Sequence, residues 1–237
     1  MAIVMTASEG SSRSPRKSVE VDPEGSLAGV PFFSALSADE LEELLAASSS
    51  HRVSRHHVVF CEGETLTHLY LAQTGSFKLV RHSEEGRQLI MSLVKPGECF
   101  GALADPIESR TLAQSLEDSL LLVVPLAAVQ RTIAQNPHFA TGLLQQALKR
   151  HENAEIAATR LVFETVAERL AHVLLELSDP DSGALGIPLN QSEIANLIGS
   201  SRETVCSILN QFRRQGLLDI EGGRLRIVEP GLLASVK

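Results

Sequence analysis

The segment from Leu189 to Arg214 constrains the fold more than any other part of the chain. Apolar residues recur at helical spacing on both sides of Gly199, which predicts two amphipathic helices joined by a tight turn. Asn190 is a good N-cap for the first helix, and Gly199 favours a left-handed C-cap after it. The second helix is then expected to bury one stripe, formed by Val205, Ile208, Leu209 and Phe212.

The start of this second helix carries polar side chains that suit contact with a DNA duplex. In a helix-turn-helix motif, this turn meets base edges in the major groove. Arg202 can bind a guanine with two hydrogen bonds, and Glu203 can accept one from a cytosine amino group. Hydroxyl groups and backbone N–H groups suit phosphates. The alternative is an ordinary helical hairpin inside a core. The predicted DNA-binding residues are Gln191, Ser192, Ser200, Ser201, Arg202, Glu203, Thr204, Ser207 and Arg224.

A short hairpin is predicted between Leu217 and Ile227, where alternating apolar residues flank Gly222-Gly223. Arg224 and Arg226 would lie on one side of it, either along a phosphate backbone or simply in solvent. A helix-turn-helix followed by such a wing is a winged helix.

The run from Ile198 to Val205, with the hairpin after it, resembles the Crp/Fnr family of bacterial transcription regulators. The resemblance extends from about Val30 to Ile227. It implies a homodimer that binds double-stranded DNA at a pseudo-palindromic site, with half-sites about one helical turn apart. It also implies a transcriptional activator with RNA polymerase as a partner. The family has a basic residue where this chain has Ser207, so we expect a DNA site that differs from the common one.

Glycines recur every eleven or twelve residues between His51 and Pro125, at Gly63, Gly75, Gly86 and Gly97. Short β-prone runs lie around them, at residues 57–61, 69–72, 77–82, 89–94 and 120–125. This spacing predicts an antiparallel sandwich or barrel in which the glycines form turns with positive φ. With the resemblance, the expected fold class is α+β: a cyclic-nucleotide-binding-like β-roll (jelly roll), a long dimerisation helix and a C-terminal winged helix-turn-helix.

The segment from Pro96 to Ala104, followed by Arg110-Thr111, corresponds to the family's effector cassette. In the family, a glycine lets the backbone approach a cyclic phosphate, and N–H groups of a one-turn helix face that phosphate. An arginine neutralises it, and a glutamate holds the ribose. Here Ala102 replaces the glutamate, a loss of about 1–3 kcal/mol for a buried ribose hydroxyl. The pocket positions that the resemblance implies are Gly101, Ala102, Leu103, Arg110, Thr111, Ala154 and Glu155.

The last two of these positions carry base-contacting hydroxyl residues in cyclic-nucleotide members, whereas this chain has alanine and glutamate there. We therefore expect a β-roll whose pocket is altered or filled, and a regulator that is not controlled by cyclic AMP. The alternative is a sensor whose β-roll binds cyclic AMP or a related nucleotide and gates DNA or partner binding.

A long helix is predicted from Asn136-Pro137 to about Arg160 or beyond. Its apolar and small residues step by three and four, as in a heptad seam. We expect this seam to join two copies of the chain, and the alternative is a helix packed on its own β-roll. A further amphipathic helix is expected from Val162 to Ser178. The predicted seam residues are Leu144, Ala147, His151, Ala154, Ala158 and Leu161.

The expected domain boundaries are a flexible tail at residues 1–26, a β-roll sensor or scaffold at 27–135, the dimerisation helix at 136–163 and the winged helix at 164–237. The net charge of −8 argues against a general nucleic-acid coat protein. Between Ile187 and Ile227, however, five arginines face four acidic residues, a local charge of +1. No apolar run has the length of a membrane span, so we expect a cytoplasmic protein without a membrane partner.

Eight histidines and three cysteines raise the question of a metal or haem site. His56, His57 and Cys61 form the tightest group, but neighbouring residues on a strand point to opposite faces. We therefore expect neither metal nor haem. Cys99, beside the cassette, is expected to be a buried inert thiol, with a thiolate sensor as the alternative. No P-loop, nucleophile elbow or HExxH motif is present, so we do not expect an enzyme.

Overall fold

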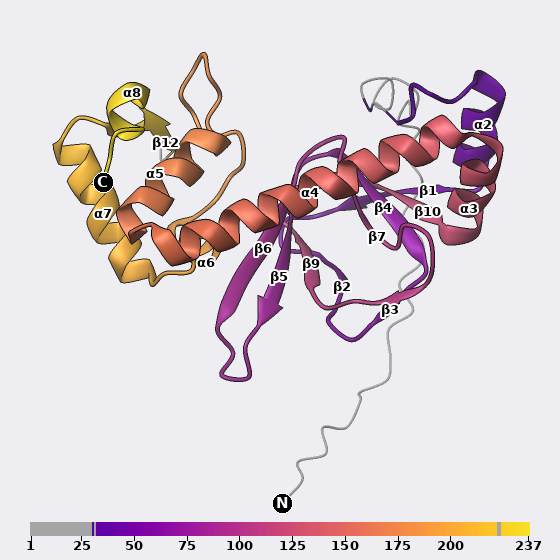
Figure 1. The fold of residues 1–237 in the computed structure, drawn as a ribbon, viewed down its shortest axis with the longest axis horizontal. Helices are drawn as coiled ribbons and strands as arrows, with labels where there is room; N and C mark the ends of the chain where they lie inside the picture. Colours follow the sequence, from indigo (N-terminus) through magenta and orange to yellow (C-terminus); the bar gives the residue numbers. More distant parts are fainter. Residues whose placement is uncertain (1–29, 31, 222–223) are drawn as a thin grey trace, which may run out of the picture.

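The computed structural model describes residue 30, residues 32–221 and residues 224–237. A β-roll leads into one long helix, which runs to a winged helix-turn-helix at the C-terminal end (Figure 1). The expected α+β fold class is thereby confirmed. The predicted tail at residues 1–26 and the predicted wing turn at Gly222-Gly223 lie outside the described residues. None of the described helices combines the length and the apolar character that a membrane span requires.

The β-roll consists of two four-stranded antiparallel sheets and a two-stranded ribbon. The sheets have the strand orders β1-β10-β4-β7 and β2-β9-β5-β6, and β3 pairs with β8. The predicted runs correspond to β2, β4, β5, β6 and β10, whereas the shorter β3, β7, β8 and β9 and the polar β1 were not predicted. The strands are β1 Ser49–Val53, β2 Val58–Phe60, β3 Thr65–Leu66, β4 His68–Thr74, β5 Phe77–His82, β6 Gln88–Val94, β7 Cys99–Gly101, β8 Ile107–Glu108, β9 Leu112–Ser115 and β10 Ser119–Pro125.

Glycines form the turns of the roll, as the spacing predicted. Gly63, Gly75, Gly86 and Gly97 all have φ between +74° and +84°. At Gly75 there is a second constraint, because a Cβ atom would lie 2.1 Å from the Ser119 hydroxyl oxygen. Only glycine fits both the backbone conformation and the space at that turn.

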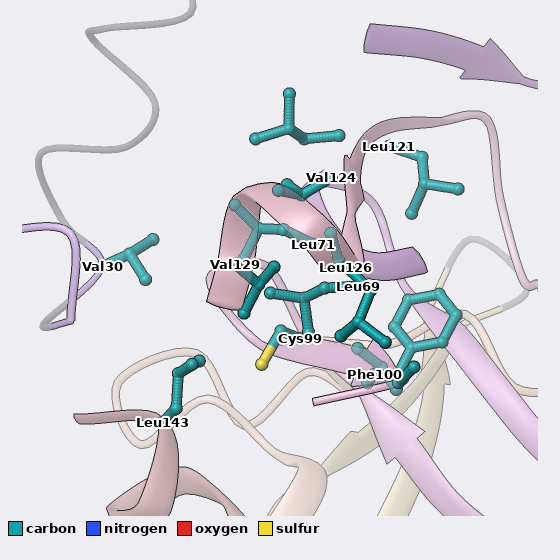
Figure 2. Packing of buried hydrophobic residues seen from close by; sticks show 14 of the residues in the cluster. Val30, Leu69, Leu71, Cys99, Phe100, Leu121, Val124, Leu126, Val129 and Leu143 are labelled. Carbon is teal, nitrogen blue, oxygen red and sulfur yellow. The ribbon is translucent and has the colours of Figure 1, made fainter. Parts of the chain in front are cut away.

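Apolar side chains from both sheets and the flanking helices fill the core of the roll. Figure 2 shows part of this cluster, in which Leu69, Leu71 and Cys99 pack among side chains from the neighbouring strands and helices. An aromatic group lies beside it: the Phe100 ring is 5.4 Å from Tyr70 and 5.9 Å from Phe60, between ring centroids. Aromatic rings therefore occupy the interior beside the cassette.

Three helices flank the roll: α2 (Ala38–Ala46), α3 (Leu126–Gln135) and α4 (Pro137–Phe163). Ser37 and Glu40 form a capping box at the start of α2, with Ser37 N donating to Glu40 at 2.7 Å. Asn136 caps α4 by accepting from the backbone N–H groups of His138 and Phe139. The long helix was predicted, and α3 was not.

The chain breaks between α4 and α5 (Val166–Leu177), and the predicted start of the second helix at Val162 is wrong. Val162 and Phe163 belong to α4, and Glu164 is extended. Thr165 then caps α5 by accepting from the backbone N–H of Glu168, whose carboxylate accepts from Thr165 N in return. This capping box, rather than the apolar period, determines where α5 begins.

The winged helix contains α5, α6 (Gln191–Ile198), α7 (Arg202–Arg214), the antiparallel pair β11 (Leu218–Glu221) and β12 (Arg224–Ile227), and α8 (Pro230–Leu233). Its core is separate from that of the roll. The predicted stripe of α7 faces this core, since Val205, Leu209 and Phe212 are buried and Ile208 is half-buried.

Candidate nucleic-acid interface and effector region

Local hydrogen bonds build the helix-turn-helix as its sequence predicted. The Asn190 side chain accepts from the N–H groups of Ser192 and Glu193, and Glu193 Oε2 accepts from Asn190 N at 2.9 Å. Gly199 ends α6 in the left-handed conformation, with φ +65° and ψ +48°. Ser201 caps α7 by accepting from Thr204 N at 3.1 Å. These caps determine both helix ends that meet at the turn.

The first turn of α7 is exposed. Ser201, Arg202, Glu203 and Thr204 lie in solvent, whereas Val205 is fully buried. Hydrogen bonds from the backbone N–H of Glu203 and the Ser201 side chain lower the pKa of the Glu203 carboxyl. At neutral pH this side chain is therefore an acceptor only, as contact with a base amino group requires. The alternative of a hairpin closed inside a core is wrong for this turn.

The other predicted DNA-contact residues differ in how exposed they are. Gln191, Ser192 and Ser207 are exposed, and Ser200 is half-buried. Gln191, Ser192 and Arg202 line one concavity of about 790 Å³, whose far wall includes Arg55 and Glu117 of the roll.

The two arginines of the predicted wing differ in what the structure describes of their side chains. The Arg226 guanidinium donates to the Ser182 carbonyl at 2.9 Å, so it is held by its own domain. Arg224 belongs to β12 by its backbone, and its side chain lies outside the described part of the chain. The roles of all these residues in DNA binding stay predictions.

The winged helix docks on the roll where α6 packs against β6, an arrangement that the sequence did not reveal (Figure 1). Lys78 Nζ of β5 donates to Glu193 Oε1 of α6 at 2.8 Å, and both side chains are buried. Asn196 Nδ2 donates to Gln88 Oε1 at 3.3 Å. Residues 78 and 193 lie 115 positions apart, so no local pattern identifies them as partners.

The effector cassette has a glycine where the family has one, but neighbouring protein atoms occupy the space around this glycine. Gly101 has φ +94°, and a Cβ there would lie 2.6 Å from Tyr70 Cδ2. Ala102 is fully buried, and its N–H donates to the His68 carbonyl at 3.0 Å. Residues 103–105 form bends, so the one-turn helix that the resemblance implied is absent from this described segment. The backbone donor at Ala102 is therefore already used within the roll.

The remaining pocket positions do not converge. Arg110 is exposed, while Leu103 and Thr111 are half-buried. Ala154 and Glu155 point to different sides of α4. Ala154 lines a cavity between the domains, and Glu155 Oε1 lies 3.4 Å from His151 Nε2 on the exposed side. Gly101, Ala102 and Arg110 do not line that cavity.

Two side chains of α4 that the sequence reasoning missed hold the helix against the cassette. Gln146 Oε1 accepts from Cys99 N at 2.8 Å, and its Nε2 donates to the Gly97 carbonyl at 3.3 Å. Arg150 donates to the Cys99 carbonyl. Their spacing of four residues on a helix is the only sequence signal for this contact.

The Cys99 thiol is inert in this environment. Burial raises its pKa to about 12, although the nearby Arg150 charge opposes that rise. A thiol with this pKa is protonated at neutral pH and is not a thiolate sensor. The expectation of a buried inert thiol is therefore supported.

The seam of α4 faces solvent. Leu144 is 58% exposed, and His151, Ala154, Ala158 and Leu161 are exposed too, while Ala147 is half-buried. Only Phe139 and Leu143 of this helix are buried, so its seam is not packed on the roll. Leu148, Ile156, Val162 and Phe163 of the same helix are exposed as well, with Leu148 and Val162 beside the seam.

Among the described residues, no group of three or more His, Cys, Asp and Glu side chains is placed to hold a metal ion. The assumption that His56 and His57 lie on a strand is wrong. Both precede β2, and His56 lies in a turn with φ +66°.

Two family models match the chain. Residues 50–136 match the cyclic nucleotide-binding domain, and residues 168–236 match the Crp-like helix-turn-helix domain. The chain is 31% identical over 188 residues to the CRP-like cAMP-activated global transcriptional regulator of Mycobacterium tuberculosis, covering 76% of this chain and 84% of that protein. It is 29% identical over 210 residues to the cyclic AMP receptor protein of Thermus thermophilus, covering 88% and 97%.

The arrangement of elements is also shared with solved structures. FixK2 from Bradyrhizobium japonicum matches with a TM-score of 0.73 over 79% of this chain and 96% of that chain, at 22% identity. At that identity the likeness is one of fold. Together with the sequence matches over both domains, it leads to one conclusion: the chain belongs to the Crp/Fnr family of bacterial transcription regulators.

Proposed function

We propose that the protein is a homodimeric, sequence-specific DNA-binding regulator that activates transcription from a pseudo-palindromic site. The observation that carries this proposal is the exposed first turn of α7. Arg202 and Glu203 lie in solvent there, and Val205, in the next turn, anchors the helix in the core. A rigid helix with free polar groups at its N-terminal end suits the major groove. Family membership supports RNA polymerase as a partner and the cytoplasm as the location in this proposal.

The homodimer is supported by the exposed apolar face of α4. A soluble monomer rarely leaves a continuous apolar stripe uncovered, and a heptad stripe on a long helix fits a second copy of itself. Two copies would place two α7 helices for two half-sites. The small residues Ala147 and Ala158 would let the helices approach closely.

We further propose that cyclic AMP does not control this regulator. Ala102 offers no acceptor for a ribose, its N–H is bonded to His68, and Tyr70 packs against Gly101. Both named relatives carry cyclic AMP in their names, and Gly101, Arg110 and Thr111 are retained here, which favours the alternative of a nucleotide-responsive sensor. The two functions differ in a measurable way.

Selection of bound duplexes from a random pool, with and without cyclic AMP or cyclic GMP, tests both functions. We expect enrichment of one two-fold symmetric sequence that is the same in all three conditions. Failure to enrich any sequence would contradict the DNA-binding role. Enrichment only with a nucleotide, together with micromolar binding in calorimetry, would replace the first proposal by the alternative.

A further inference from the structure

The turn that joins β1 to β2 of the roll, residues 54–57, presents cationic and titratable side chains to solvent. Arg55, His56 and His57 are all exposed there. His56 has φ +66°, a conformation that residues other than glycine rarely adopt. Such a conformation persists only where the surrounding structure enforces it. The β1–β2 turn is therefore held in one shape.

Hydrogen bonds to β9 provide this enforcement. The backbone N–H of His56 donates to the Ser115 carbonyl at 3.0 Å, and that of His57 donates to the Ser115 hydroxyl at 2.9 Å. The Gln114 side chain donates to the His56 carbonyl, also at 3.0 Å. Two consecutive residues of β9 thus fix the turn from which the Arg55 side chain extends.

The register of the second sheet determines where this turn lies relative to the helix-turn-helix. Gln114 of β9 is the partner of Lys78 on β5. Lys78 in turn donates to Glu193 of α6 at 2.8 Å, inside the interface between the two domains. The turn is bonded to β9, β9 to β5, and β5 to α6. This chain of contacts holds the β1–β2 turn near the N-terminal part of α6.

The β1–β2 turn and the helix expected to read DNA consequently line the same concavity of about 790 Å³. Arg55 lines it from the roll, whereas Arg202 and Arg213 line it from the first and last turns of α7. Gln191 and Ser192, at the start of α6, belong to the same lining. None of the lining residues belongs to the effector cassette or to the predicted seam. Both domains therefore face one space beside the predicted DNA contacts.

The charge of this space suits a polyanion. Three arginines line it against one carboxylate, that of Glu117, which is an excess of two positive charges. The Glu117 carboxylate accepts from the Ser76 hydroxyl at 2.7 Å. The arginines are exposed, and none of them forms an ion pair with another described residue. Their guanidinium groups are therefore available to phosphate oxygens, which they can bind with two hydrogen bonds.

We propose that Arg55 of the roll binds a phosphate of the DNA backbone beside the bases that Arg202 reads, so that both domains hold the duplex. This inference rests on the proposed DNA binding. The contact is to the backbone because Arg55 lies on the far wall of the concavity from α7. Phosphate contacts position a duplex without reading its sequence. Arg55 is thus a positioning residue that orients the duplex on α7.

The salt dependence of DNA binding measures this contact. The slope of log K against log salt concentration changes by about 0.9 for each phosphate contact. Arg55→Ala should therefore reduce the slope by about 0.9 for each chain of the dimer. It should also weaken binding severalfold at low salt, equally on selected and on random duplexes, because both have the same backbone. An unchanged slope would overturn the proposed contact.

Two control variants separate a contact from a general loss of charge. Arg131→Ala removes the same charge from α3, at the opposite end of the molecule from α7 (Figure 1), and should leave the slope unchanged. Arg55→Lys keeps the charge and should retain most of the slope. An equal reduction in Arg131→Ala would assign the effect to net charge. A reduction in Arg55→Lys as large as in Arg55→Ala would mean that the charge at residue 55 binds no phosphate. Either result would overturn the proposal.

Neutral methylphosphonates, placed one at a time in the selected duplex, locate the contact. At the phosphate that Arg55 binds, this substitution should weaken binding severalfold in the native protein and have no effect in Arg55→Ala. If every methylphosphonate acts equally on the two proteins, Arg55 contacts no phosphate and the inference is wrong. That result leaves the proposed function intact, whereas a protein that selects no duplex would refute the proposed function itself.

Discussion

The Lys78 ammonium lies 2.8 Å from the Glu193 carboxylate, and the two side chains are only 8% and 5% exposed. This ion pair joins β5 of the roll to α6 of the helix-turn-helix. Glu193 also completes the capping box at Asn190, so one carboxylate both starts the helix and determines its place on the roll. Desolvation offsets much of the attraction in a buried pair, which therefore specifies an arrangement more than it stabilises one.

Lys78→Met is expected to loosen this docking. Without Lys78, the buried Glu193 carboxylate would be unpaired, which destabilises the docked arrangement by about 3–5 kcal/mol. The interface is then expected to open more often, because opening lets water solvate the carboxylate. Amide hydrogen exchange in β5 and α6, followed by mass spectrometry, should become at least tenfold faster. Glu193→Gln should act similarly, because glutamine keeps the capping box but removes the charge.

The double variant Lys78→Met/Glu193→Gln leaves no unpaired charge and should recover part of the protection. Arg87→Met is the control, since it breaks a pair with Glu85 that is largely exposed and worth less than about 1 kcal/mol. If the buried-pair variants exchanged no faster than this control, the ion pair would have no part in docking.

Helix caps could be predicted from the sequence, whereas contacts between the two domains could not. Asn136 and Asn190 bond to backbone groups two or three residues away, so these residues could indicate a helix start from the sequence alone. The pair between Lys78 and Glu193 depends on how two domains meet. A lysine in a strand looks the same whether a helix covers it or solvent does.

The same reasoning applies to the candidate site. The exposed turn at Arg202 could be predicted because it belongs to a local motif. The hydrogen bonds of Gln146 to β7 and the bonded N–H of Ala102 could not, because they depend on how strands and helices approach in space. The start of α5 was misplaced because an apolar period does not show where one helix ends and the next begins.

Arg202→Ala should weaken binding to the selected site by about 1–3 kcal/mol and relax the preference at one base position per half-site. Binding to random DNA should change much less. Fluorescence anisotropy on both duplexes provides the comparison, with Arg131→Ala on α3 as a control for lost positive charge. Equal losses on selected and random DNA would mean that Arg202 contacts phosphate only.

Gly199→Ala should lower the free energy of unfolding by about 1–2 kcal/mol, because φ is +65° at this position and alanine disfavours the left-handed region. The added Cβ would also lie 2.9 Å from Leu161 Cδ2, a side-chain end that can move. Urea unfolding measures the change. Gly231→Ala is the matched control, since nothing lies within 4 Å and φ is ordinary there. A loss as large in the control would remove the backbone explanation.

Leu144→Glu should convert the expected dimer into monomer, because it places a charge in the predicted apolar seam. Sedimentation velocity measures the mass directly. Ile107→Glu is the control, as Ile107 is similarly exposed but lies on β8. DNA affinity should fall with the loss of the second recognition helix. If the unsubstituted protein sediments as a monomer, the proposed dimer through the α4 seam is wrong.

Cys99 should resist alkylation by iodoacetamide at pH 8, whereas the exposed Cys61 reacts. Burial raises the Cys99 pKa from 9.0 to about 12, so the native thiol stays protonated where an unfolded one ionises. The linked contribution to stability is present below pH 9 and is lost as pH rises toward 12. Mass spectrometry of labelled peptides checks the reactivity. Rapid labelling of Cys99 in the folded protein would contradict its burial.

The long helix has a mechanical consequence. With 27 residues it is about 40 Å long, and only Glu164 and Thr165 separate it from the next helix. Arg160 lies 3.8 Å from the Glu164 carboxylate as an ion pair, and Arg169 donates to the Glu164 carbonyl at 2.7 Å, so both contacts restrain that joint. A tilt of about 5° at one end of such a rod moves the other end by about 3.5 Å. A shift of this size would change the spacing of the two α7 helices of the expected dimer relative to successive turns of a duplex.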